Sequence, residues 1–176
     1  MFYSKTTGGF YTREIHSDNI PADAVEISAA THAALLADQS AGKVIQSDKS
    51  GNPVAVDPPP LTTAQMWDGI KTERDRRKAG GVKIGAKWFH SDDGSRIQQM
   101  GLVMMGASLP AGLQWKTMDG SFIPMTPALA QQVFTGQAAS DQAIFAVAEQ
   151  HRVAMEASPD PAAYDFSTNW PKIFGE

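Results

Sequence analysis

The sequence predicts an α+β fold in two parts. The first part is a small N-terminal mixed sheet with one helix, and the second is a C-terminal helical domain with two β-hairpins. Short aromatic or alternating runs separated by Gly- and Asn-containing turns indicate the strands, and long stretches with apolar residues at helical spacing indicate the helices. Three consecutive prolines, Pro58 to Pro60, fit neither a central strand nor a helix. We therefore expect a domain over 1–57, a Pro-rich linker over 58–61, a domain over 62–158 and an aromatic tail over 159–176.

The N-terminal elements follow from turn and cap chemistry. Aromatic runs at 2–4 and 10–11 flank a Thr/Gly turn, which predicts a hairpin, and 24–27 alternates like a half-buried strand. Ser28 is placed to cap a helix over 29–40, with Leu35 and Leu36 turned inward and Gly42 as its stop. Residues 43–47 and 53–56 are the expected last two strands, joined by the turn at 48–52.

In the second part, a hairpin followed by a helix occurs twice. A helix capped by Thr62 or Thr63 runs first, to about residue 79, with Met66, Trp67 and Ile70 on one side. A hairpin over 82–90 then precedes a helix that is capped within 91–93 and continues to 110. A hairpin over 113–123 precedes a helix from Pro127 to about 157, capped by Thr126, which can break at Thr135-Gly136. This order predicts a ββα-like repeat.

The amino-acid composition excludes or disfavours several classes of function. With 42% hydrophobic and 19% charged residues and no apolar run near the length of a membrane helix, we expect a soluble globular protein without a membrane span. The polar, turn-rich start is unlike a secretory signal, so we expect the chain to act in the cytoplasm where it is made. The absence of cysteine excludes disulfides, thiolate catalysis and Cys-based metal sites, and a formal charge of −4 disfavours general nucleic-acid binding.

The polar candidates for a site have simpler structural explanations. The cations at 71–78 could bind phosphate, lipopolysaccharide or an acidic protein face, but acids lie among them and a solvated helix face is favoured. The segment from His90 to Asp93 holds the residue types of a hydrolytic triad or a metal site, but neighbours in sequence rarely converge on one atom, and helix capping is favoured. No glycine-rich loop is followed by the Lys-Ser/Thr of a phosphate loop. We therefore predict no catalytic residue, no metal and no cofactor. The candidates weighed in this way are Lys71, Arg74, Arg76, Arg77, Lys78, His90, Ser91, Asp92, Asp93, His16 with Asp18, His32 and His151.

Methionine and tryptophan residues also have two interpretations. Met100, Met104, Met105 and Met118 could form an adaptable binding groove, but their helical spacing favours core packing. Tryptophan both fills cores and anchors interfaces. We expect Trp88 and Trp115 in the core, and Trp170 at an interface. The tail from 164 to 176 has no periodic spacing of its aromatic residues, so it either packs on the body or binds a partner.

Two resemblances give these patterns a context. Met1 to Ser4, the turn Thr6 to Gly9, the run from Glu14 to Ile27, and the segments 39–45, 51–54 and 57–60 together resemble the start of phage tail fibre assembly proteins. The runs 73–77, 80–82, 87–92, 95–99 and 113–117 resemble a functionally unassigned domain that recurs in phage tail proteins.

The resemblance implies a chaperone that binds the C-terminal region of a trimeric tail fibre and helps it fold or trimerise, without catalysis. It implies action in the host cytoplasm during assembly and, in some relatives, retention at the fibre tip. The alternatives are a structural or adhesin subunit of the tail that contacts host surface glycans, and an enzyme acting on surface polysaccharide, for which the sequence selects no pair of carboxylates. We expect the partner contacts at Phe2, Tyr3, Phe10, Tyr11, Trp170 and Phe174.

Overall fold

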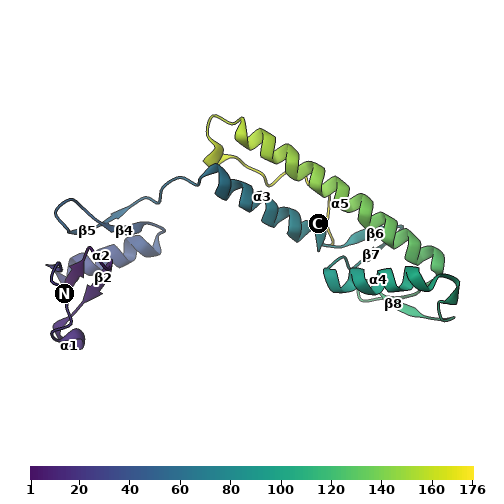
Figure 1. Cartoon of the computed structure of the whole chain (residues 1–176), viewed down its shortest axis with the longest axis horizontal. Coiled ribbons are helices and arrows are strands. Elements are labelled where there is room, and N and C mark those ends of the chain that lie inside the picture. The colour runs from purple at the N-terminus through teal and green to yellow at the C-terminus, as the bar shows by residue number, and fades with distance from the viewer. The chain divides into compact units, whose positions relative to one another are not determined.

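A computed structural model describes all 176 residues and divides the chain into two compact units, Met1–Pro60 and Leu61–Glu176 (Figure 1). The predicted α+β class is confirmed, because helices and small antiparallel sheets occur in both units. None of the helices combines the length and apolarity needed to cross a membrane.

The first unit begins with a three-stranded antiparallel sheet in the order β2-β1-β3. Its strands are β1 (Phe2–Ser4), β2 (Gly9–Tyr11) and β3 (Val25–Glu26), and a single turn of helix, α1 (Arg13–His16), follows β2. Asp23 holds the β1-β2 turn, since it accepts hydrogen bonds from the Ser4 hydroxyl and the Thr6 amide, each at 2.9 Å. These bonds, the Thr6 amide first, lower the pKa of Asp23.

The rest of the first unit is α2 (Ala29–Ser40) and the hairpin of β4 (Val44–Ser47) and β5 (Pro53–Val56). Ser28 caps α2 as predicted, accepting the Thr31 amide at 2.9 Å. Two expectations were wrong. The strands form two separate antiparallel sheets instead of one mixed sheet, and only Leu35 is buried, while Leu36 is exposed. Adjacent helical residues point about 100° apart, and α2 buries only one narrow stripe.

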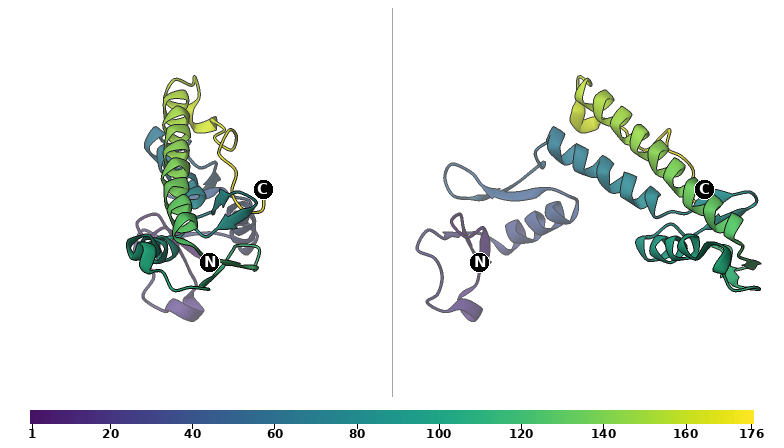
Figure 2. Two further views of the ribbon diagram at one scale, coloured as in Figure 1. Left: turned by 90° about the vertical axis from the view of Figure 1, so that its right-hand side faces the viewer. Right: turned by 45° about the vertical axis from the view of Figure 1, so that its right-hand side comes forward.

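The second unit is organised around a 30-residue helix, α5 (Pro127–Glu156). One half of α5 packs on α3 (Thr63–Lys78) and the other half on α4 (Asp93–Met105), an arrangement that is visible from each direction (Figures 1 and 2). The predicted caps are confirmed. Thr62 and Gln65 form a capping box on α3, and Thr126 accepts the Leu129 amide at the start of α5.

The predicted order of a hairpin and a helix, twice over, is also confirmed. β6 (Val82–Ile84) and β7 (Lys87–Phe89) precede α4, and β8 (Gln114–Lys116) and β9 (Phe122–Pro124) precede α5. Short 3-10 turns, η1 (Gly106–Ser108) and η2 (Pro161–Ala163), follow α4 and α5. The expected weak point at Gly136 does not break α5. Instead, the Ile84 side chain packs where a Cβ at Gly136 would stand, so the glycine permits close approach of β6.

The second unit has two hydrophobic clusters, and α5 contributes to both. The first cluster lies between α3, α5 and the tail, and consists of Met66, Ile70, Ile144, Ala148, Met155 and Trp170. The second lies among the hairpins and the N-terminal half of α5, and consists of Val82, Phe89, Met125, Ala130 and Val133. Of the two tryptophans expected in the core, Trp115 packs against the second cluster, whereas Trp88 is half-buried and meets Phe174 edge-on.

Candidate partner-binding surfaces

The predicted N-terminal contact residues lie on two opposite faces of the first sheet. Tyr3 and Phe10 are directly opposed on β1 and β2, with ring centroids 5.3 Å apart, and the His32 ring of α2 meets Phe10 at 4.6 Å. Only 2% of Tyr3 is exposed. Tyr3 therefore belongs to the interior of this unit and offers no surface to a partner, contrary to expectation.

Phe2 and Tyr11 are the directly opposed pair on the other face of the sheet. The Arg13 guanidinium lies 5.2 Å from the centre of the Phe2 ring, and the His16 ring lies 5.0 Å from that of Tyr11. Both aromatic residues are half-buried, and Phe2 lines two shallow hollows of about 280 and 360 Å³. This face keeps aromatic surface within reach of a partner.

The predicted contact residues of the tail are also divided. Trp170 is only 8% exposed and belongs to the first core cluster, and its indole N–H donates to the Phe166 carbonyl at 2.6 Å. The expectation that Trp170 lies at an interface was thus wrong, because this part of the tail completes the core between α3 and α5. Phe174 remains exposed and packs edge-on against Trp88.

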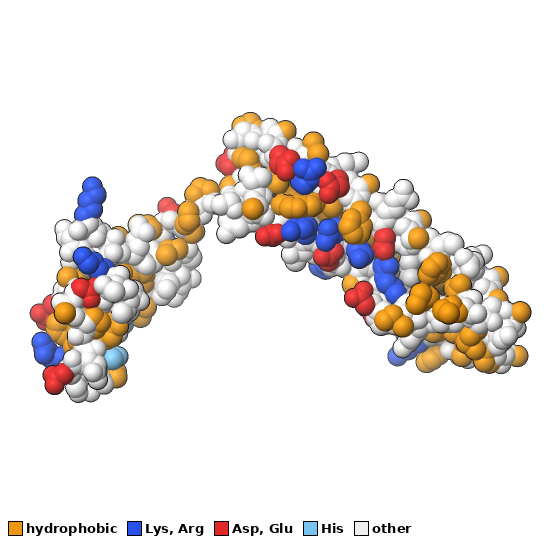
Figure 3. Space-filling model, in the orientation of Figure 1, with side chains coloured by type: hydrophobic (Ala, Val, Ile, Leu, Met, Phe, Trp, Pro, Cys, Tyr) orange, Lys and Arg blue, Asp and Glu red, His pale blue; other side chains and the backbone are white.

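The cations of α3 are engaged within the molecule, and Arg77 is buried, so it does not belong to the solvated helix face that we expected. Arg76 and Arg77 share Glu73, at 2.7 and 2.6 Å, and Arg77 also donates to the Pro171 carbonyl at 2.8 Å. Arg74 pairs with Asp75 in a two-point contact. The space-filling view shows blue and red side chains interspersed along this region (Figure 3). The sharing lowers the pKa of Glu73, first through the Arg76 hydrogen bond, and raises the pKa of Arg76.

The remaining polar candidates serve the fold. The Ser91 hydroxyl is buried, donates to the Lys78 carbonyl at 2.6 Å and accepts the Gly81 amide at 2.8 Å, so it holds the end of α3 to the first hairpin. Asp92 caps α4 through the Ser95 amide at 3.0 Å, as predicted. No group of three or more His, Asp or Glu side chains is arranged to hold a metal ion.

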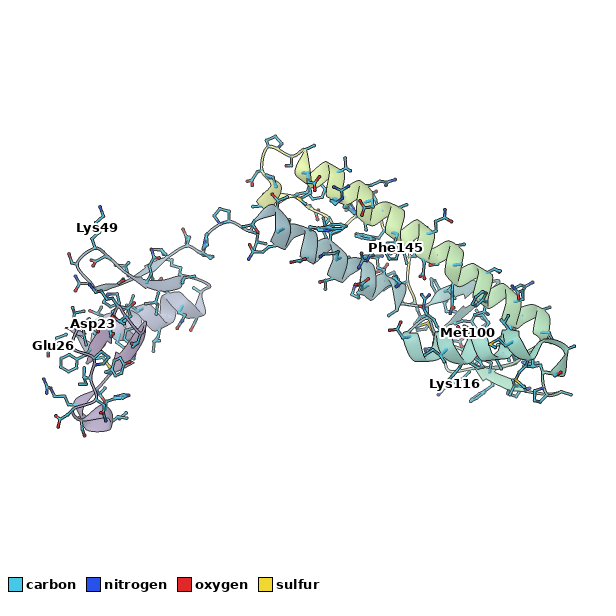
Figure 4. All side chains as sticks on the ribbon, viewed as in Figure 1. Asp23, Glu26, Lys49, Met100, Lys116 and Phe145 are labelled. Carbon is cyan, nitrogen blue, oxygen red and sulfur yellow. The ribbon has the colours of Figure 1, made fainter.

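The largest unexpected feature is an apolar ridge on α4. Ile97, Met100 and Met104 are 65%, 45% and 80% exposed, and their spacing places them on one side of the helix. We call these three residues, with the exposed Phe134 of α5, the apolar ridge. Figure 4 labels Met100 on α4, and Figure 3 shows apolar side chains gathered in this part of the unit. The prediction that Met100, Met104 and Met105 pack in the core was wrong, since all three are exposed.

A groove of about 250 Å³ lies along the ridge between α4 and α5. Its lining is Arg96, Ile97, Met100, Phe134, Gln137, Ala138 and Asp141. The Arg96 guanidinium donates two hydrogen bonds to the Asp141 carboxylate, at 2.7 and 2.9 Å, so the two charges in the lining neutralise each other. The groove is therefore apolar in surface and without net charge.

Buried amides explain why the ridge points outward. Gln99 lies on the opposite side of α4 and is almost fully buried, where its amide donates to the His90 carbonyl at 2.9 Å. The Gln137 amide of α5 donates in turn to the Gln99 side-chain oxygen. Because a buried amide without partners is costly, these bonds fix which side of α4 faces α5.

Comparisons with known proteins confirm both predicted resemblances. The family model described as "Domain of unknown function (DUF4376)" matches residues 61–168. A curated relative, the "Probable tail fiber assembly protein" of Shigella phage SfV, is 45% identical over 65 residues, which are 37% of this chain and 39% of the relative. The match thus spans about two fifths of that relative's length. No solved structure matches the chain.

Proposed function

The chain belongs to the DUF4376 family, and from this membership and its similarity to a tail fiber assembly protein we propose that it is a tail fibre assembly chaperone of a phage or prophage. In this role it binds the C-terminal region of a trimeric tail fibre, promotes folding or trimerisation, and carries out no catalysis. The 45% identity to the Shigella phage SfV protein is the observation that carries the proposal. The chaperone acts in the host cytoplasm during assembly and can remain on the fibre tip.

The physical need for such a chaperone comes from the fibre. A long β-rich trimer has many contacts between distant residues, so it folds slowly and exposes unpaired strand edges before its three chains meet. A small protein that covers apolar surface during this period reduces aggregation. The apolar ridge suits this task, since exposed thioether and aliphatic side chains adapt to varied apolar partners.

We place the main fibre contact on the apolar ridge and its groove. Methionine at two of the four ridge positions, together with the neutral lining, favours an uncharged apolar segment of the fibre chain. Phe2, Tyr11 and Phe174 remain proposed secondary contacts because their rings keep accessible surface, and Phe10 is a weaker one because it packs on His32.

Co-expression with the C-terminal region of a tail fibre protein from the same phage or prophage tests this function. Size-exclusion chromatography with light scattering measures the molar mass of the fibre and of any complex. The measurement is made with the wild-type chain and with a double variant, Ile97→Ser with Met104→Ser. Val153→Ser is the matched control, because Val153 is an exposed aliphatic residue on α5 that does not line the groove. We expect soluble fibre trimer with the wild type and the control, and a large loss of trimer with the double variant.

The outcomes distinguish a failure of the proposed chaperone function from a failure of the proposed contact surface. A fibre that trimerises equally well without this protein, and never associates with it, refutes the chaperone role and favours a tail subunit. A double variant that works as well as the wild type refutes the ridge as the contact but leaves the chaperone role standing. Co-elution with the finished trimer shows retention at the tip.

A further inference from the structure

The sulfur atoms of the chain differ in how far the fold shields them. The chain has eight methionines and no cysteine, so every sulfur atom is a thioether. Met66, Met125 and Met155 are at most 5% exposed and belong to the two hydrophobic clusters. The Met118 sulfur packs where a Cβ on Gly81 would stand, against the backbone that leads into β6. Packing therefore protects these thioethers from reagents in solution.

Three methionines of α4 are instead open to solvent. Met100, Met104 and Met105 are 45%, 80% and 43% exposed, and Figure 4 labels Met100. Met100 and Met104 belong to the apolar ridge. Met105 points about 100° away from Met104 around the helix axis, so it lies outside the ridge. A small oxidant reaches these three thioethers before it reaches the core.

We propose that Met100 and Met104 are sites of reversible oxidation to methionine sulfoxide by a peroxide, and that oxidation makes the apolar ridge polar while the fold stays intact. With hydrogen peroxide, a sulfur lone pair attacks one oxygen and the O–O bond breaks. The transferred oxygen passes its proton to the departing hydroxide, which leaves as water, and the sulfur has lost two electrons to the peroxide. A methionine sulfoxide reductase reverses the change with a dithiol, which becomes a disulfide while the oxygen leaves as water.

The groove beside the ridge has no free side-chain donor for a sulfoxide oxygen. The Arg96 guanidinium is hydrogen-bonded to Asp141 and to the carbonyls of Ser91 and Lys78. The Gln137 amide donates to the Gln99 side chain and to the His90 carbonyl. An apolar partner that covers the ridge must then bury a polar S–O group without a hydrogen bond, which weakens binding.

The same change has little effect on the fold. The side chains of Met100 and Met104 already face water, so their sulfoxides stay solvated, and no cavity or buried polar group is created. Oxidation would disrupt the protein at Met66 or Met155, where a sulfoxide would lie inside the first cluster, but those thioethers are buried. Exposure therefore directs the oxidation to the contact surface.

Peptide mapping by mass spectrometry on the full chain treated with hydrogen peroxide tests the sites. We expect sulfoxide to form at Met100 and Met104 about tenfold or more faster than at Met66, Met125 and Met155. The circular dichroism spectrum should not change, and the chain should elute earlier in hydrophobic interaction chromatography until a reductase restores it. Equal oxidation rates at ridge and core, unfolding as sulfoxide appears, or an unchanged elution would each overturn the proposal.

Leucine variants assign the change in elution to the ridge. The double variant Met100→Leu with Met104→Leu keeps apolar side chains of similar volume that a peroxide does not oxidise, so most of the peroxide effect should disappear. Met105→Leu is the matched control, because Met105 is exposed on the same helix outside the ridge, and it should keep most of the effect. The opposite pattern would refute the ridge as the surface that oxidation changes.

The consequence for assembly rests on the proposed function. Peroxide treatment should lower the affinity of the wild-type chain for the C-terminal region of the tail fibre protein about tenfold or more. The loss should be much smaller in the double leucine variant, when that variant is compared with its own untreated form. If the untreated chain never binds the fibre, the chaperone role fails, and the sulfoxide map and the elution still decide the proposal. If the oxidised chain binds as tightly as the untreated chain, control of the ridge by oxidation is refuted.

Discussion

Gly80→Ala is a test of how the C-terminal segment Tyr164–Glu176, the strap, is seated, because two known effects oppose each other at this residue. Gly80 does not adopt a positive φ, so alanine fits its backbone without strain. Such a substitution ordinarily stabilises a protein by about 0.4–1 kcal/mol, since it restricts the unfolded chain. In this structure a Cβ on Gly80 would lie 2.6 Å from Cγ2 and 2.7 Å from Cβ of Ile173 in the strap.

The structure predicts that the overlap of the added Cβ with Ile173 outweighs the stabilisation gained by restricting the unfolded chain. The Ile173 Cβ is a branch point that no side-chain rotation can move, so the strap must shift away. Loss of the Ile173 burial costs about 1.5–3 kcal/mol, which exceeds the gain from the unfolded state. We expect a net decrease of about 1–2 kcal/mol in the free energy of unfolding.

Urea denaturation followed by circular dichroism measures this change. The matched control is Gly101→Ala, which lies within α4 with no atom within 4 Å of the added Cβ and should stabilise the protein by about 1 kcal/mol. If Gly80→Ala were as stable as the wild type while Gly101→Ala gained stability, the close seating of Ile173 on Gly80 would be refuted.

Three further predictions concern buried amides, acid sensitivity and capping. Gln99→Leu should lower the free energy of unfolding by about 1–3 kcal/mol in urea denaturation, because it removes the side-chain oxygen that accepts from the Gln137 amide and leaves that amide only its 3.3 Å bond to the His90 carbonyl. The pKa of Glu73 is lowered below its usual 4.5, mainly by Arg76, so its contribution is present at pH 7 and is lost as the pH falls below about 4.5. The difference in stability between the wild type and Glu73→Gln should therefore shrink there, and a difference unchanged at pH 3 would contradict this. Thr126→Ala should cost about 1 kcal/mol through loss of the α5 cap, measured by thermal unfolding.

The sequence was most informative where local chemistry decides the structure. Ser28, Thr62, Asp92 and Thr126 are each followed by a helix whose first free amides they accept, and such caps require only a few neighbouring residues. The hairpins were predictable for the same reason, since their turns depend on glycine and asparagine at fixed positions.

The candidate site was not predictable, because it depends on contacts between distant segments. Ile97, Met100 and Met104 form a regular apolar stripe that indicates a core face, and no local signal shows that the opposite side of α4 is buried. That side is held by Gln99, whose partners are the His90 carbonyl and Gln137. The buried side of α4, which we expected to carry methionine, instead carries Gln99, whose hydrogen bonds are satisfied.

The tail shows the same limitation. The aromatic residues from Tyr164 to Phe174 have no periodicity, so nothing in the segment itself indicates which rings are buried. Gly69 on α3 and Gly80 just after its end provide the information, because their missing side chains leave space for Phe166 and Ile173. A sequence interpretation that considers each segment alone cannot connect these glycines with a strap about 100 residues away.

Helix α5 is unbroken, so it connects the two ends of the second unit rigidly. Thirty residues at 1.5 Å each make a helix about 45 Å long, and the two hydrophobic clusters occupy its two halves. The two hydrophobic clusters therefore keep a fixed distance along α5 and a fixed rotation relative to each other about its axis. Phe134 of the apolar ridge and His151, which contacts the tail, lie seventeen positions apart on one continuous ladder of hydrogen bonds, so they share a single frame whose dimensions do not depend on loops.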